Sequence, residues 1–179
     1  MSLVDLLCSI TTGSERRRRL LTPIILVMAL SLLLLVLSAS LFVDRVLALR
    51  PLLPGALGSG LGTALLVGGL ALWSQCIALF RGKGVPVNPP RELVKVGPYA
   101  WVRNPMLLGL WVAFVGLGFL FHSVSLVFVG TPVLALVTLM EVKLVEEPEL
   151  ERRLGATYNK YKADVPMLIP KRPAPRRFR

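Results

Sequence analysis

A long uncharged segment near the N-terminus constrains the fold more than any other feature of the sequence. Residues 20–43 form 24 consecutive positions without Asp, Glu, Lys or Arg. At about 1.5 Å of rise per residue, a helix of this length exceeds the roughly 30 Å hydrocarbon thickness of a bilayer. The segment follows the arginine run Arg16–Arg19 but is longer than the roughly 7 to 15 apolar residues of a cleaved signal peptide. We therefore expect a retained membrane-spanning helix.

Three further apolar segments predict an all-α integral membrane bundle of about four transmembrane helices. They cover residues 51–80, 105–121 and 124–140. The last two are separated only by His122 and Ser123, so we expect them to form a tight helical hairpin. In the second segment, Gly58 and Gly62 form a small-xxx-small pair that lets another helix approach closely.

The distribution of the cations predicts the topology. The net charge is +11, and with the first arginine run in the cytoplasm, 19 of the 21 Lys and Arg residues fall on that side. Only Arg45 and Arg50 lie outside. This bias accounts for the basic composition without nucleic acid and favours contact with anionic membrane lipids. We expect one multi-pass membrane domain, residues 1–179, with both termini, a loop (81–104) and a C-terminal amphipathic helix with a basic tail (146–179) in the cytoplasm.

The predicted hairpin brings two polar segments together. Residues before its first helix and after its second must emerge at the same membrane surface. The segment GPYAWVRNP ends with Arg103, Asn104 and Pro105, and the segment EVKLVEEPELERR contains Glu146 and Glu147. The sequence thus predicts a polar site at the cytoplasmic ends of the helices, built from segments that lie far apart in the chain.

Each polar segment also has a purely structural interpretation. Asn104 and Pro105 suit the start of a helix, while Tyr99 and Trp101 are typical of a membrane interface and Arg103 could reach lipid phosphates. The acidic run could complement the N-terminus of a following helix. The apolar residues after it fall at helical spacing, as in a helix that lies on the bilayer. These residues are Leu150, Leu154, Tyr158 and Tyr161.

The loop between the second and third segments favours a functional role. It is long, charged and aromatic, and loops of this length are often functional. Gly82, Gly84 and Gly97 permit unusual backbone angles and close approach to a ligand. Cys8 and Cys76 lie far apart, so neither a disulfide framework nor a metal site is predicted.

The two polar segments resemble a known family. NPPRELVKVGPYAWVRNPMLLG followed by EEPELERRLGATYNKYKADVPMLIP is similar to the integral-membrane methyltransferases that include isoprenylcysteine carboxyl methyltransferase and phospholipid methyltransferases. In that family an Arg-His-Pro-x-Tyr-x-Gly motif and a distant Glu-Glu pair hold S-adenosylmethionine. Here the motif runs from Arg103 to Gly109, with Asn104 in place of histidine and Leu107 in place of tyrosine. Asparagine can still donate and accept hydrogen bonds, whereas leucine cannot.

The resemblance implies a cofactor site and a set of catalytic residues. The implied catalytic residues are Arg103, Glu146 and Glu147. The implied cofactor-binding residues are Gly97, Tyr99, Arg103, Asn104, Pro105, Gly109, Glu146 and Glu147. The ribose, ammonium and sulfonium of S-adenosylmethionine favour carboxylate acceptors, and its carboxylate favours arginine. No metal is required, because methyl transfer needs mainly alignment of donor and acceptor.

The resemblance leaves the acceptor and two rival functions open. The acceptor is expected to be a lipid, a lipidated molecule or another hydrophobic compound that enters from the bilayer and offers a carboxylate or an amine. An amine must lose a proton, for which Glu146 or Glu147 is the nearest base. The rivals are an NADPH-dependent membrane reductase of the steroid-reductase type and a non-catalytic membrane scaffold.

Overall fold

The computed structural model describes residues 15–82 and 93–170, without the side-chain surroundings of residues 15–22, 25 and 82. The side chains of the arginine run, the loop glycine Gly84 and the basic tail 171–179 therefore lie outside the described part of the chain. All regular elements in the described ranges are helical, as predicted. They are α2 (Glu15–Val46), α3 (Gly55–Gly82), η1 (Gly97–Ala100), α4 (Pro105–Leu120), η2 (Leu126–Gly130), α5 (Thr131–Glu141), η3 (Val142–Glu146), α6 (Glu147–Leu154) and α7 (Ala156–Asp164).

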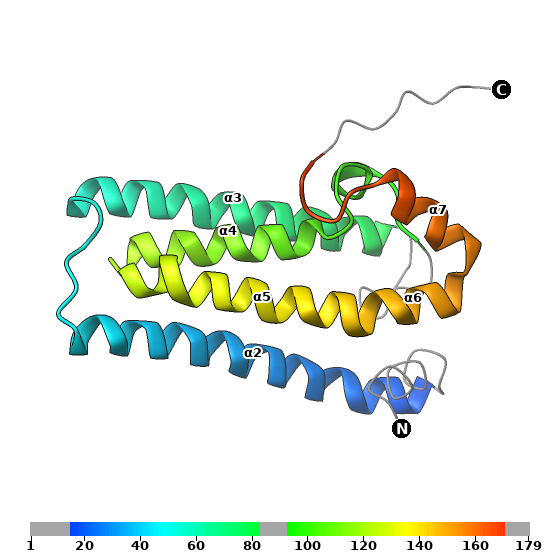
Figure 1. The fold of residues 1–179 in the computed structure, drawn as a ribbon, viewed down its shortest axis with the longest axis horizontal. Coiled ribbons are helices and arrows are strands. Elements are labelled where there is room, and N and C mark those ends of the chain that lie inside the picture. The colour runs from blue at the N-terminus through cyan, green and yellow to red at the C-terminus, as the bar shows by residue number, and fades with distance from the viewer. Residues whose placement is uncertain (1–14, 83–92, 171–179) are drawn as a thin grey trace.

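The four long helices run side by side, and the C-terminal helices fold back over one end of the bundle (Figure 1). η1, α6, α7 and the start of α2 lie at this end, which we call the Arg103 end. The connections from α2 to α3 and from α4 to η2 lie at the opposite end, which we call the His122 end. The chain alternates in direction from one long helix to the next, so segments distant in sequence meet at each end.

The lengths of the apolar helices fit a membrane protein. Three helices are long and apolar enough to cross a bilayer: Leu26–Val46, Gly55–Arg81 and Leu126–Leu154. α4 is shorter, with 16 residues, and is apolar throughout. The last helix extends well beyond the predicted segment 124–140, because η2, α5, η3 and α6 follow one another without a break.

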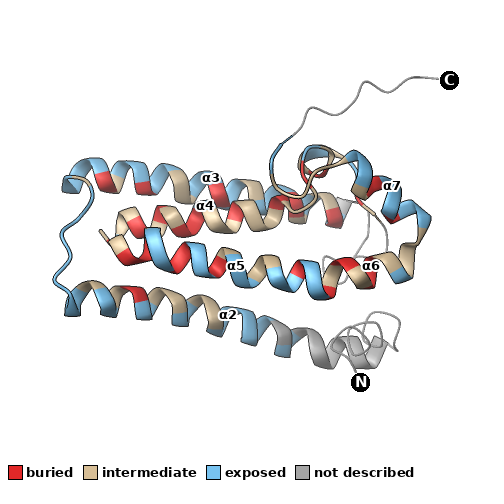
Figure 2. Cartoon of the chain, viewed as in Figure 1, coloured by how far each residue is buried: buried red, intermediate tan, exposed pale blue. Residues whose placement is uncertain are grey.

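Glycines allow α3 and α4 to pack with their backbones in contact. A Cβ atom on Gly62 would lie 2.7 Å from the backbone nitrogen of Leu120, which confirms the predicted close approach at this glycine. A Cβ atom on Gly109 would lie 2.7 Å from the carbonyl oxygen of Gly69. Figure 2 shows the buried positions of α3 and α4 along their shared seam.

The hairpin of α4 and the last helix anchors α2. Phe114, Leu126 and Leu134 form a buried cluster against which partly buried leucines and a valine of α2 pack. At the His122 end, Asp44 accepts hydrogen bonds from the hydroxyl of Ser123 and from the backbone N–H of Ser125, the latter at 3.0 Å. A buried apolar contact and a polar clamp therefore hold α2 to the hairpin.

The C-terminal segment differs from the single amphipathic helix expected from the sequence. Gly155 adopts a φ of 52° and divides the segment into α6 and α7. The predicted apolar stripe faces protein instead of a bilayer: Leu150, Tyr158 and Tyr161 form a buried cluster, with Leu154 packed against it. The bend at Gly155 lets α7 return toward the turn η1, where the hydroxyl of Tyr161 meets the carbonyl of Tyr99.

Candidate functional site

A short turn presents the polar residues at the Arg103 end. Gly97 has a φ of 61°, which glycine adopts without strain, and opens the 3₁₀ turn η1. Tyr99 in this turn is buried against Cys76 and Phe80, with its ring edge-on to Phe80 at a centroid distance of 5.5 Å. Of the predicted cofactor-binding residues, Gly97 and Tyr99 thus shape the turn and anchor it to α3.

The motif Asn104-Pro105 begins α4. Asn104 occupies the N-cap position and Pro105 the first turn, yet the Asn104 side chain makes no capping hydrogen bond. Pro105 is fully buried. The pair therefore begins a helix, as its purely structural interpretation predicted, but the Asn104 amide does not make the capping hydrogen bond.

Arg103 forms a buried ion pair with the acidic segment. Its Nη1 donates to Oε1 of Glu147, and the two side chains are only 12% and 9% exposed. The backbone N–H of Arg103 donates to the carbonyl of Pro166 at 2.9 Å. The hairpin therefore brings Arg103 and Glu147 together as predicted, and the C-terminal segment adds a further contact.

One donor of Arg103 has no partner. The Nε atom is buried and has no hydrogen-bond acceptor among the described residues. Buried polar atoms in folded proteins are nearly always hydrogen-bonded, so an unpaired donor at a polar site requires an explanation. An acceptor supplied by a ligand would satisfy it.

Lys162 is a residue of this site that the sequence did not reveal. Its Nζ donates to Oε2 of Glu147 and to Oε1 of Glu151, both at 2.8 Å. These hydrogen bonds raise the pKa of Lys162, because both carboxylates favour its charged form. Lys162 lies on α7, beyond the bend at Gly155, and no regular helical spacing links it to Glu147.

Two tyrosines of α7 cover the site. The hydroxyl of Tyr161 donates to the carbonyl of Tyr99 at 2.8 Å, which fixes α7 to the turn η1. Burial raises the pKa of Tyr158, the charge of Glu147 raises it further, and the neighbouring Arg103 opposes the shift. Tyr158 therefore lies beside the ion pair as a neutral hydroxyl.

Glu146 differs from its neighbour in its surroundings. It is half-buried and accepts no hydrogen bond from a described residue. Burial first, and then the thiol of Cys76 and the charge of Glu146, raise the pKa of Tyr99, so the Glu146 carboxylate lies within electrostatic range of that hydroxyl. Glu146 closes η3, a π-helical turn, and such turns are frequent at functional sites.

The remaining predicted residue, Gly109, lies away from this cluster. Its missing Cβ faces the backbone of Gly69 and Trp73 on α3, so it serves helix packing. The same holds for Gly116, whose Cβ would lie 2.5 Å from the backbone nitrogen of Leu66.

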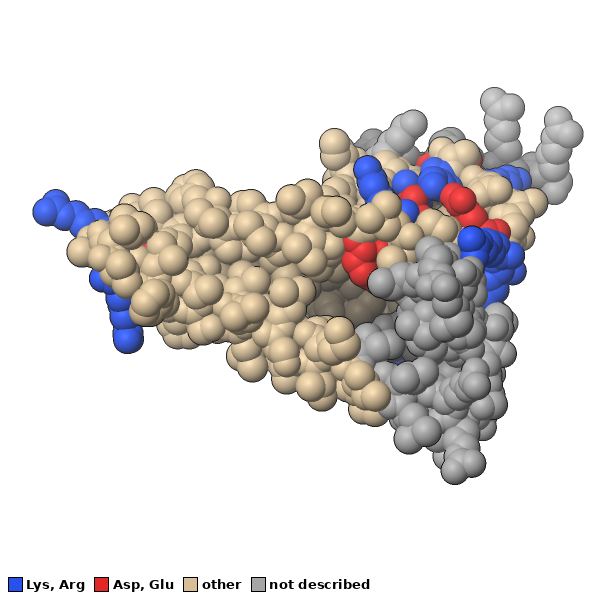
Figure 3. All heavy atoms as spheres, turned by 60° about the horizontal axis from the view of Figure 1, so that its bottom comes forward, with Lys and Arg blue, Asp and Glu red and all other residues tan. Residues whose placement is uncertain are grey.

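The surface at the Arg103 end is polar and hollowed. Figure 3 shows charged side chains gathered at this end of the molecule, with acidic atoms beside a hollow whose other described rim atoms are uncharged. Glu141, which is exposed, and the half-buried Glu146 lie on this part of the last helix.

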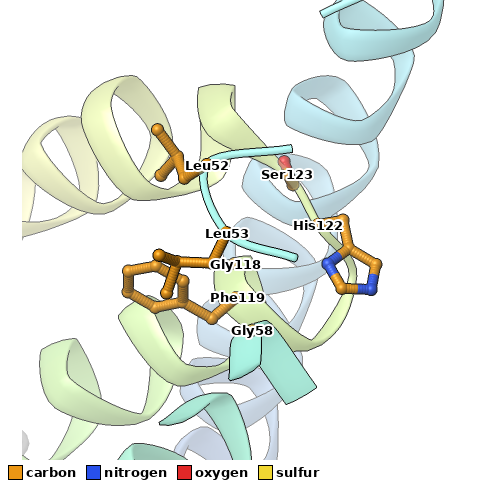
Figure 4. Close-up of a pocket in the computed structure, with 7 residues that line it drawn as sticks. All are labelled: Leu52, Leu53, Gly58, Gly118, Phe119, His122 and Ser123. Carbon is orange, nitrogen blue, oxygen red and sulfur yellow. The ribbon is translucent and has the colours of Figure 1, made fainter. Parts of the chain in front are cut away.

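A second pocket lies at the His122 end. Leu52, Leu53, Gly58, Gly118, Phe119, His122 and Ser123 line it (Figure 4). Its enclosed space is on the order of one water molecule, and its lining is mostly apolar. His122 thus lines a small pocket at a turn, and this pocket cannot hold a nucleoside cofactor.

Comparison with known proteins decides the family. The family model described as phospholipid methyltransferase matches residues 57–157, which is more than half of the chain. The chain belongs to the phospholipid methyltransferase family. The match includes Arg103, Asn104, Glu146 and Glu147. Comparisons with curated proteins and with solved structures give no match.

Membership in the phospholipid methyltransferase family gives the chain a general function. It is a membrane methyltransferase, in agreement with its three long apolar helices and the resemblance found in the sequence. The matched range begins in α3 and ends in α7, so it contains the ion pair and the turn η1.

Proposed function

We propose that this phospholipid methyltransferase homologue uses S-adenosylmethionine, bound at the Arg103 end, to methylate a lipid, a lipidated molecule or another hydrophobic acceptor. The observation that carries the proposal is that two groups of opposite character, each without a partner among the described residues, lie at this same end of the bundle. One is the buried Nε donor of Arg103, and the other is the Glu146 carboxylate, which accepts no hydrogen bond from a described residue.

These residues fit the chemistry of the cofactor. An arginine donor suits its carboxylate, and a carboxylate suits its ammonium or ribose hydroxyls. When bound, the cofactor supplies an activated methyl group for in-line displacement. The uncommitted amide of Asn104 offers one more donor and acceptor beside Arg103. Leu107 offers none, so the family tyrosine has no substitute at its own position.

The hydrophobic acceptor is supported by the surroundings of the site. The described surface beside the acidic atoms carries few charges, and the helices that frame the bundle expose many large apolar side chains. A lipid acceptor whose acyl chains lie in the bilayer could present its headgroup at the Arg103 end. For an amine acceptor, Glu146 is the candidate base, since no described cation neutralises its carboxylate.

We also propose that the Arg103 end faces the cytoplasm. Arg45 and Arg50 lie at the opposite end, and most other cations of the sequence fall on the Arg103 side of the spans. The positive-inside rule then orients the bundle, with both termini in the cytoplasm. Cysteine-accessibility labelling from either side of a sealed vesicle tests this orientation.

Calorimetric titration of the detergent-purified protein with S-adenosylmethionine, and separately with NADPH, tests the proposed cofactor. We expect saturable binding of S-adenosylmethionine, no binding of NADPH, and loss of binding in a folded Glu146→Gln variant. Binding of NADPH alone would support a reductase. Binding of neither ligand, with or without added lipid extract, would support a scaffold.

A further inference from the structure

Two adjacent glutamates have different surroundings in the structure. Both side-chain oxygens of Glu147 are engaged: Oε1 accepts from Arg103, and Oε2 accepts from Lys162 at 2.8 Å. Its side chain is 9% exposed, whereas Glu146 is half-buried and accepts no hydrogen bond from a described residue. A ligand therefore has little access to Glu147 and more to Glu146.

The helix geometry separates the two side chains. Consecutive residues of a helix point about 100° apart. The π-helical turn Val142–Glu146 adds one residue just before Glu147 and so shifts the register of everything that follows. The Glu147 side chain is directed to Lys162 of α7 and to Arg103, whereas Glu146 makes neither contact.

From these contacts we propose a division of roles, which rests on the function proposed above. Glu147 is a positioning residue that links α7, through Lys162, to Arg103 and fixes the guanidinium of Arg103. Glu146 is the member of the pair that offers its carboxylate to the ammonium or ribose of the cofactor. In the Glu-Glu pair of this chain, Glu146 thus contacts the cofactor and Glu147 holds the surrounding residues in place.

Lys162 extends the contacts of Glu147 to other parts of the chain. Lys162 connects Glu147 to Glu151 and carries the network onto α7. Two more hydrogen bonds join the same parts of the chain: Tyr161 to the carbonyl of Tyr99, and the N–H of Arg103 to the carbonyl of Pro166. Without the Glu147 charge, Arg103 would remain buried with no described anion beside it, which is strongly unfavourable.

Hydrogen exchange of the α7 amides, measured by mass spectrometry on the full-length protein in nanodiscs, separates the two roles. The variants are Glu147→Gln, Lys162→Met and Glu146→Gln, with Lys162→Arg as the conservative control. We expect the first two to speed exchange of Ala156–Asp164 by about tenfold, since each removes a charge-assisted hydrogen bond. Lys162→Arg keeps a cation that can donate to both carboxylates, and Glu146→Gln removes no described contact, so both should stay within about twofold of wild type.

Titration with S-adenosylmethionine completes the experiment. Glu146→Gln should weaken binding by about tenfold or more, although its α7 exchange is unchanged. The Glu147→Gln, Lys162→Met double variant should bind no more weakly than Glu147→Gln alone, because both substitutions break one network. Lys162 is more exposed than Glu147, so its variants report on the network even where Glu147→Gln does not fold.

Three results would overturn the division of roles. Weaker binding in Glu147→Gln with unchanged α7 exchange would make Glu147 a direct ligand. Faster α7 exchange in Glu146→Gln would make Glu146 part of the support. Failure of the folded wild type to bind S-adenosylmethionine would remove the proposed function and the role of Glu146, while the exchange data would still decide whether Glu147 positions α7.

Discussion

The two ends of the bundle each hold a polar cluster, but among the described residues only the cluster at the Arg103 end leaves a buried donor unsatisfied. At the His122 end, Asp44 receives hydrogen bonds from Ser123 and Ser125, and the pocket beside it is about the size of a water molecule. At the Arg103 end, the Nε of Arg103 is unsatisfied among the described residues, and Glu146 is unpaired there. A closed cluster serves to hold helices together, whereas an incomplete one is suited to a ligand.

Replacing Arg103 should have the largest effect. Arg103→Met leaves Glu147 buried with Lys162 as its remaining cation and removes the proposed carboxylate donor. We expect methyl transfer to fall at least about 100-fold and the free energy of unfolding to fall by about 3 kcal/mol. Arg50→Met replaces an exposed arginine at the His122 end and is the control. Its rate of methyl transfer should stay within about twofold of wild type. Initial rates with radiolabelled cofactor and denaturant titration measure both quantities, and equal losses in the two variants would contradict the distinction between the ends.

The α3–α4 seam that joins the two ends should respond next. Gly69→Ala would place a Cβ atom 2.6 Å from the backbone nitrogen of Ala113, so we expect a loss of about 2 kcal/mol in unfolding free energy. Gly68→Ala is a matched control on the same helix, since nothing lies within 4 Å of its missing Cβ. It should be neutral or slightly stabilising. Similar stabilities for the two variants in a thermal melt would show that the seam is looser than described.

Asp44 provides the test of the closed cluster. Asp44→Ala leaves the buried hydroxyl of Ser123 and N–H of Ser125 without their acceptor, at a cost of about 1 to 2 kcal/mol. The kcat and KM for methyl transfer should remain within about twofold. Asp164→Asn, at an exposed position, controls for the loss of a surface charge. A large change in KM with unchanged stability would move the ligand site to the His122 end.

The smallest effect is expected in the middle of the hairpin. Trp111→Phe removes the 3.2 Å hydrogen bond from its Nε1 to Oγ1 of Thr138 and should cost about 1 kcal/mol. Activity should be unaffected. A double-mutant cycle with Thr138→Val measures the coupling between the two side chains, and a coupling energy near zero would show that the contact contributes nothing.

The sequence predicted the helical architecture and the meeting of Arg103 with Glu147, because apolar length and a tight hairpin are encoded locally. It did not predict which glutamate is paired. That depends on the π-helical turn before Glu147 and on Lys162, which reaches it only because the chain bends at Gly155. The apolar stripe with Tyr158 suited a helix that lies on a bilayer, but it packs against protein. Periodicity shows that one face of a helix is buried and does not show what covers it. The sequence also did not predict the cluster around Asp44. Asp44 lies near the end of α2, and its serine partners lie in the connection between α4 and η2, far along the chain.

Photo-crosslinking of radiolabelled S-adenosylmethionine to the purified protein, followed by peptide mapping, tests most directly whether the ligand site lies at the Arg103 end. We predict label in peptides that contain residues 97–109 or 141–150, competed by unlabelled cofactor and absent in Glu146→Gln. Competable label confined to peptides around residues 44–58 or 118–127 would place the site at the opposite end and contradict the account.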